Sequence, residues 1–168
     1  TRNGSTFFSF KEVRRKESIS AMYGILLFLH IISATVWTGG HLVLSLAILP
    51  RAFKEQSTEE LKQFESAYER VGIPALLIQV ITGLWLAYRL APDLSQWFSF
   101  NNMVLSLIGT KLILLALTLG LAIDARFRII PKLSLHELKV LAWHIIPVTI
   151  LSVLFVIVGV LFRTGWFF

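Results

Sequence analysis

The sequence contains no cysteine and only two methionines among its 168 residues. Without cysteine, the chain can form neither disulfide bonds nor thiolate metal sites. The two methionines, Met22 and Met103, lie at the ends of apolar segments. The soft sulfur ligands that select Cu(I) are therefore scarce, and nitrogen donors are the main candidates for binding any metal.

Charged residues are also few, at 15% of the chain, whereas 55% of the residues are hydrophobic. An ordinary soluble domain is about 45–50% apolar. The formal net charge of +6 does not indicate binding to nucleic acid, because basic residues that border apolar spans usually lie among lipid headgroups. The composition predicts a protein whose main partner is the lipid bilayer.

Four segments are long enough to cross a bilayer, which takes about 20 mostly apolar residues. They are residues 23–49, 71–90, 103–123 and 138–162. We therefore expect an all-α membrane protein in which residues 21–168 form an antiparallel bundle of four transmembrane helices. Residues 1–20 are expected to form a polar or interfacial arm.

The segments between the spans carry helix and turn signals. Pro50 is expected to end the first span, because proline cannot donate the hydrogen bond that continues a helix. Residues 57–60 have the spacing of a capping box and predict an amphipathic helix between spans one and two. Residues 134–137 repeat this spacing, and residues 91–102 are typical of a turn. Basic residues flank both sides in nearly equal numbers, so the membrane orientation stays open.

Polar residues inside the spans are the candidates for function, since an ionisable group there costs about 2.5–3.5 kcal/mol. The polar residues of this kind are His30, Gln79, Lys111, His41 and His144. His30 and His41 are 11 residues apart on one helix face, about 16 Å along the axis. The antiparallel path predicts two polar levels, one with His41 and His144 and one with His30 and Lys111.

Small residues accompany these polar groups. Gly39 and Gly40 precede His41 and follow the mid-span Trp37, and glycine lets a flat ligand or another helix approach the backbone closely. On the second span a stripe of small residues and one amide has helical spacing: Gly72, Ala75, Gln79 and Gly83. The stripe fits a ligand slot, but simple helix packing is an equally direct explanation.

Neutral imidazole is a common metal ligand and the usual axial ligand of haem iron. The histidines, glycines and apolar walls together favour one or two b-type haems. In this interpretation His41 and His144 form an axial pair, while His30 and Lys111 form a second polar level. Copper bound by His30, His41 and His144 is the alternative. Histidines that only hydrogen-bond neighbouring helices are a third explanation.

The first span resembles a known family. Residues 29–41 read Leu-His-Ile-Ile-Ser-Ala-Thr-Val-Trp-Thr-Gly-Gly-His and are followed by Leu-Pro-Arg at 49–51. This pattern resembles the integral-membrane domains of the copper resistance protein D (CopD) family and is similar to protoporphyrinogen oxidase of the HemJ type. Gly-Ile-Pro-Ala at 72–75, Thr-Gly-Leu at 82–84 and Thr-Lys-Leu at 110–112 extend the likeness.

The resemblance implies different roles for different residues. In HemJ-type proteins the first-helix histidine is regarded as a haem ligand and the third-helix lysine as essential, which would assign these roles to His30 and Lys111. The CopD-like feature is Gly39-Gly40-His41, and that family is associated with copper uptake across the inner membrane. A full CopD protein has about twice as many spans, so this chain could form the whole transporter only as a homodimer.

We therefore expect a b-type haem protein of the bacterial inner membrane that transfers electrons from a quinone-like or small-molecule donor. An axial pair from His41 and His144 would leave no open iron position, which favours electron transfer over oxygen chemistry. A copper-handling membrane protein is the first alternative, and a porphyrinogen oxidase that uses His30 and Lys111 is the second. Whether the chain is an enzyme stays open at this point.

Overall fold

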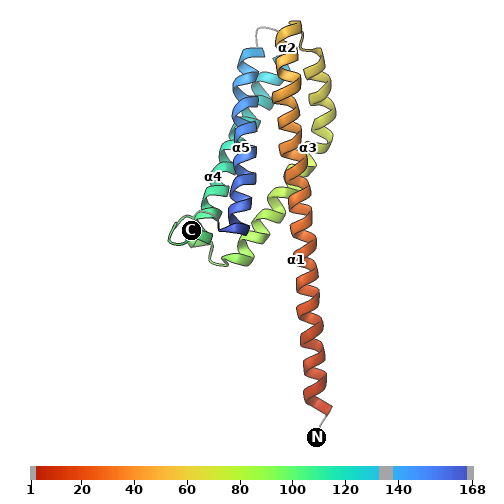
Figure 1. Cartoon of the computed structure of the whole chain (residues 1–168), viewed down its shortest axis with the longest axis vertical. Coiled ribbons are helices and arrows are strands. Elements are labelled where there is room, and N and C mark those ends of the chain that lie inside the picture. The colour runs from red at the N-terminus through yellow and green to blue at the C-terminus, as the bar shows by residue number, and fades with distance from the viewer. Residues whose placement is uncertain (1–2, 133–137, 166–168) are drawn as a thin grey trace.

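The computed structural model describes residues 3–132 and 138–165, and these contain helices, turns and no strand. The long helices are α1 (Asn3–Val43), α3 (Glu59–Leu90), α4 (Met103–Asp124) and α5 (Leu138–Thr164). They run antiparallel to one another along the chain (Figure 1). Four helices of the described chain are long and apolar enough to span a membrane. The predicted all-α four-helix bundle is confirmed, and the chain is a multi-pass membrane protein.

Helix α1 lies at the centre of the packing. It packs along α3 on one side and along α5 on the other, and α5 in turn packs on α4 (Figure 1). Helix α3 has no comparable interface with α4 or α5 in the described part of the chain. The bundle therefore consists of two helix pairs, α1 with α3 and α4 with α5, joined mainly through α1 and α5.

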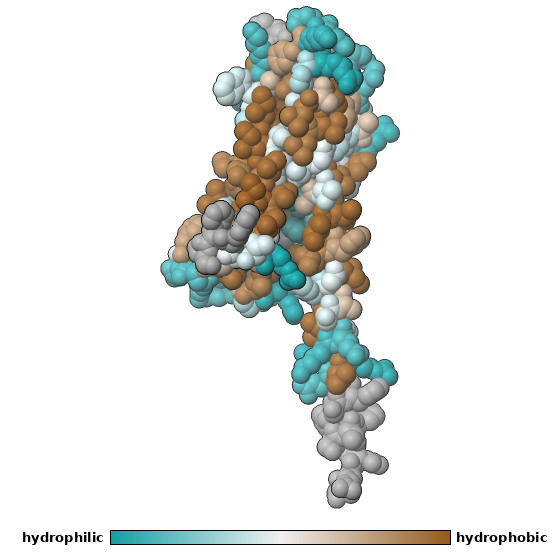
Figure 2. Space-filling model, in the orientation of Figure 1, coloured by the Kyte–Doolittle hydropathy of each residue, from teal (hydrophilic) through white to brown (hydrophobic). Residues whose placement is uncertain are grey.

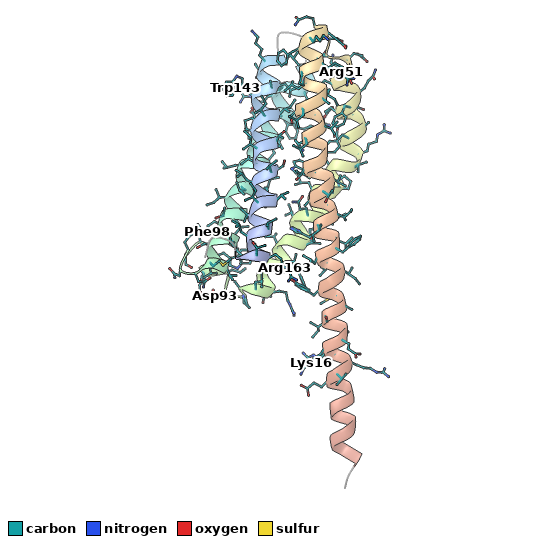
Figure 3. The ribbon with its side chains drawn as sticks, viewed as in Figure 1. Lys16, Arg51, Asp93, Phe98, Trp143 and Arg163 are labelled. Carbon is teal, nitrogen blue, oxygen red and sulfur yellow. The ribbon has the colours of Figure 1, made fainter. Side chains whose placement is uncertain are left out.

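The first helix extends well beyond the bundle at its N-terminal end (Figure 1). Side chains 12–18 on this part are all exposed to solvent or headgroups, and Lys16 projects from it (Figure 3). The helix runs without a break from Asn3 into the first span. The arm expected at residues 1–20 is thus helical from Asn3 onward and continuous with the span.

The prediction that Pro50 ends the first span is wrong. Helix α1 is followed by a π-helical turn, Leu44–Ile48, and then by α2 (Leu49–Glu55), so the chain stays helical to Glu55. Pro50 lies in the first turn of α2, where a backbone N–H is not needed for an intrahelical bond. The helical path ends instead at Gln56, which adopts a left-handed backbone with φ of 51°.

The amphipathic segment expected after the first span is the beginning of α3 and continues into the second span without interruption. No reciprocal capping box forms there: the backbone N–H of Glu59 donates to Ser57 Oγ at 3.3 Å, and the Glu60 carboxylate pairs with Arg51 at 2.7 Å. The capping spacing predicted at 134–137 lies outside the described residues.

The link at 91–102 is a turn with a short 3-10 helix, η2 (Leu94–Gln96). The Asp93 carboxylate caps it by accepting hydrogen bonds from the hydroxyl and backbone N–H of Ser95 at 2.7 and 3.0 Å. Together with a bond from the Gln96 amide, these hold the pKa of Asp93 below its ordinary value. The turn predicted from the sequence is therefore present and is closed by its own polar side chains.

Polar and apolar surfaces are separated along the long axis. Apolar side chains cover the flanks of the bundle, and polar ones gather at its two ends (Figure 2). Arg51 and Trp143 lie at the end formed by α2, whereas Asp93 and Phe98 lie at the end formed by η2 (Figure 3). We call these the α2 end and the η2 end. This distribution is that of a protein whose flanks face lipid.

The tightest apolar packing lies at the α2 end. There the buried side chains come from α2, the start of α3 and α5, and the π-helical turn η3 (Ala125–Ile129) that follows α4. Toward the η2 end, a smaller apolar cluster joins α4 to α5. The polar residues predicted for function are spread between these two regions.

Candidate functional site

The side chain of His30 is held between α1 and α3. Its Nδ1 lies 3.0 Å from the carbonyl oxygen of Gln79 and 3.0 Å from the hydroxyl oxygen of Thr82. A Cβ on Gly83 would lie 2.9 Å from Cε1 of the His30 ring, so only glycine leaves room for the imidazole at this point. The structure thus brings together His30, Gln79 and Gly83, which the sequence singled out, and adds Thr82.

The other ring nitrogen of His30 is not engaged in this way. Among the described residues, none forms a hydrogen bond with Nε2. An imidazole held at Nδ1 and open at Nε2 is the arrangement that metal-ligating histidines commonly adopt.

Lys111 lies near His30, on the facing pair of helices. Its ammonium nitrogen is 4.9 Å from the centre of the Phe162 ring and within 3.8 Å of the place a Cβ on Gly159 would take. It is close enough for its charge to act on His30, although no hydrogen bond joins the two side chains in the described chain. No carboxylate of the described residues pairs with Lys111. This partly buried cation therefore has an aromatic face, but no anion, beside it.

Gln79 adds an unsatisfied acceptor to the same region. Its Oε1 is buried and has no hydrogen-bond partner in the described part of the chain. Leaving a buried polar group unpaired costs about 1–3 kcal/mol. His30, Gln79, Thr82 and Lys111 together form a polar region inside the helices, which we call the His30 level.

The two glycines before His41 face different surroundings. A Cβ on Gly40 would overlap the ring of Tyr68 from α3, whereas a Cβ on Gly39 would meet nothing within 4 Å. The Tyr68 hydroxyl donates to the carbonyl oxygens of Val36 and Trp37 at 3.1 and 3.2 Å. Gly40 therefore lets α3 pack close to α1. The small-residue stripe of α3 does the same where Gly83 lies against His30 of α1.

His41 is bound mainly within its own helix. Its Nδ1 lies 2.9 Å from the carbonyl oxygen of Trp37, and the rings of the two residues are 4.4 Å apart. Tyr68 lies edge-on to the His41 ring at 6.0 Å. Trp37 is buried. The face of α1 that carries Trp37 and His41 is therefore covered by protein, with the Tyr68 ring of α3 beside it, and does not face lipid.

His144 uses both ring nitrogens inside the protein. Nδ1 lies 3.0 Å from the carbonyl oxygen of Val140, and Nε2 lies 2.9 Å from a carboxylate oxygen of Asp124. Asp124 also accepts a hydrogen bond from Arg128 at 2.9 Å. His144 is therefore tied to the end of α4, and neither of its nitrogens is bonded to His41.

Three residues that matter here were not among the predicted site residues: Thr82, Tyr68 and Asp124. Thr82 had a signal, because it lies three residues after Gln79 and next to Gly83 on the small-residue stripe. The contacts of Tyr68 with α1 and of Asp124 with His144 had no signal, because which partner each residue meets on another helix depends on how the helices are rotated against one another.

A ready-made cluster for a bare metal ion is not found in the described residues, which contain no group of three or more histidine, aspartate or glutamate side chains placed to hold one. No protein-family model, curated protein or solved structure matches the chain. The function is therefore argued from the site.

Proposed function

We propose that this chain holds a b-type haem in the bacterial inner membrane through His30 and acts as a haem-dependent oxidoreductase. The observation that carries the proposal is the His30 ring itself. It is clamped across two helices at Nδ1, while Nε2 has no hydrogen-bond partner among the described residues. A hydrogen bond that fixes one ring nitrogen and a free lone pair on the other are what a histidine that ligates haem iron requires.

The residues of the His30 level fit this cofactor. Lys111 is a cation without a carboxylate partner in the described chain, and a haem propionate is a carboxylate. The Oε1 atom of Gln79 is a buried acceptor that still needs a donor. Phe162 beside Lys111 supplies an aromatic wall. When bound, the haem would supply one-electron chemistry, and the protein would supply its ligand, its orientation and its electrostatics.

The geometry supports His30 as the ligand over the predicted pair of His41 and His144. Both nitrogens of His144 already have partners, and Asp124 would have to release Nε2 before that atom bound iron. Without this pair, the protein does not fill both ligand positions of the iron, which was the main reason to expect electron transfer alone. A single histidine ligand leaves a position for a small molecule. We therefore favour an oxidase of the porphyrinogen type, as the resemblance to HemJ implies.

Electron transfer from a quinone-like donor is the second candidate. It is supported by His41, whose Nε2 also has no partner in the described chain and which lies 11 residues from His30 on the same helix. Copper handling, with His30 and His41 as successive sites, uses the same two open nitrogens. A homodimer would supply the further spans that the resemblance to CopD calls for.

The deciding experiment is haem quantitation per chain, with a reduced-minus-oxidised spectrum, on the purified protein and on alanine variants of each histidine. We expect His30→Ala to lose the haem and His144→Ala to keep it. If His144→Ala loses the haem and His30→Ala keeps it, the choice of ligand is wrong. A colourless protein that binds copper stoichiometrically would support copper handling instead.

A further inference from the structure

We infer that Thr82 is a positioning residue: together with the Gln79 carbonyl, its hydroxyl holds the His30 ring with the proton on Nδ1, so that the lone pair of Nε2 is directed at the ligand. The inference deepens the proposed function and rests on it for the identity of that ligand. The tautomer itself is a property of the metal-free chain and is tested there.

The Thr82 hydroxyl has a single proton to donate. Thr82 Oγ1 lies 2.6 Å from the carbonyl oxygen of Ile78, one turn earlier in α3, and donates its proton there. Toward His30, at 3.0 Å, the same oxygen can therefore only accept.

The second neighbour of Nδ1 can also only accept a hydrogen bond from it. The carbonyl oxygen of Gln79, also at 3.0 Å, has no proton to donate. With two acceptors facing it, Nδ1 of His30 must carry the hydrogen. In a neutral imidazole the proton on Nδ1 leaves Nε2 with its lone pair free, and Nε2 is the atom without a partner in the described chain.

Burial keeps this arrangement in place. The Thr82 side chain is 3% exposed, so water does not compete for the hydroxyl oxygen. Gly83 lets the ring approach the α3 backbone closely enough to reach both acceptors. Orientation and tautomer are thus set by the same turn of α3.

The other histidines of the described chain differ in this respect. The Nδ1 atoms of His41 and His144 are bonded to carbonyl oxygens four residues earlier in their own helices. His30 alone among the three described histidines has its Nδ1 held from a neighbouring helix and by a side chain. The position of its ring therefore depends on how α1 and α3 pack.

The test uses the full chain in lipid nanodiscs, labelled with ¹⁵N-histidine and free of haem. Thr82→Val removes the acceptor while keeping the shape of the side chain, and Thr82→Ser keeps the hydroxyl. Thr35→Val is the matched control, because Thr35 also donates to its own helix, at Ile31, but is exposed and bonds no histidine. Nitrogen chemical shifts give the tautomer of His30, which a His30→Gln sample identifies, and haem titration gives the affinity.

We expect wild type, Thr82→Ser and Thr35→Val to show His30 protonated at Nδ1 only. Thr82→Val should keep the proton on Nδ1, because the Gln79 carbonyl still accepts it, but it should shift the Nδ1 resonance and weaken haem binding about 10–100-fold, the usual effect of losing a residue that orients a ligating histidine through a hydrogen bond. A proton on Nε2 in the wild type, or a Thr82→Val protein with unchanged nitrogen shifts and affinity, would overturn the inference. If the wild type binds no haem, the proposed function fails, and the nitrogen shifts of the metal-free variants still decide the role of Thr82.

Discussion

Replacing Gly40 and Gly39 separately by alanine should give opposite results, although the two residues are neighbours. A Cβ on Gly40 would overlap the Tyr68 ring, whereas a Cβ on Gly39 would meet nothing within 4 Å. Both changes gain about 0.5–1 kcal/mol of helix stability, because glycine loses more backbone freedom than alanine on folding. Overpacking at Gly40 costs about 1–3 kcal/mol. The difference between the two variants isolates this overpacking cost, since the helix contribution cancels.

The measurement is equilibrium denaturation of the purified protein in mixed detergent micelles. We expect Gly39→Ala to match or exceed the wild type in free energy of unfolding, and Gly40→Ala to fall about 1–3 kcal/mol below Gly39→Ala. A double-mutant cycle tests the cause. When Tyr68 is also replaced by alanine, the penalty of Gly40→Ala should vanish, because its colliding partner has been removed.

Haem titration of the same variants distinguishes two roles for the glycines: allowing the helices to pack, or allowing a flat ligand to approach the backbone. If a flat ligand lay against both glycines, Gly39→Ala would weaken haem binding. The packing explanation predicts unchanged affinity for Gly39→Ala, because the methyl group enters open space. Equal destabilisation by the two single variants, or a Gly40→Ala penalty that persists without Tyr68, would refute the reasoning.

Three further outcomes are expected. Tyr68→Phe should lower the free energy of unfolding in the same micelles by about 0.5–1.5 kcal/mol, because it removes the hydroxyl bonds to two α1 carbonyls; a wild-type value would show that these bonds do not matter. Asp124→Asn should lower the free energy of unfolding, because His144 and Arg128 both lose a charged acceptor, while haem content stays at the wild-type level if His30 is the ligand. The carboxyl of Asp93, followed by ¹³C NMR, should titrate below its ordinary pKa. Its contribution to the turn is then complete above the pKa of the unfolded chain and is lost as the pH falls through the lowered value; a midpoint at or above the ordinary value would contradict the capping bonds.

The sequence predicted the helices well because the signal for a membrane span is local. About 20 apolar residues in a row require a helix in lipid, wherever the rest of the chain lies. The error at Pro50 is also local in origin. Proline excludes a helix only where its missing N–H is needed, and the π-helical turn that places Pro50 at the start of a new helix has no simple pattern in the residues.

The site was predicted in part. Depth in the membrane follows from residue number, and this was enough to expect His30 and Lys111 at the same level. Direction around each helix axis does not follow, because it depends on how the helices rotate when they pack. That is why Gly39 and Gly40 differ, and why the partners of His30 and His144 proved to be Thr82 and Asp124.

The two helix pairs divide the His30 level between them. His30 lies on α1, and its ring is hydrogen-bonded to Thr82 of α3. Lys111 lies on α4, against the Phe162 ring of α5. Since α3 has no comparable interface with α4 or α5 in the described chain, the imidazole and the ammonium group belong to different helix pairs. The distance between the two groups is therefore set by how the two pairs pack on each other, through α1 with α5 and through the apolar cluster at the α2 end, and not by the packing within either pair.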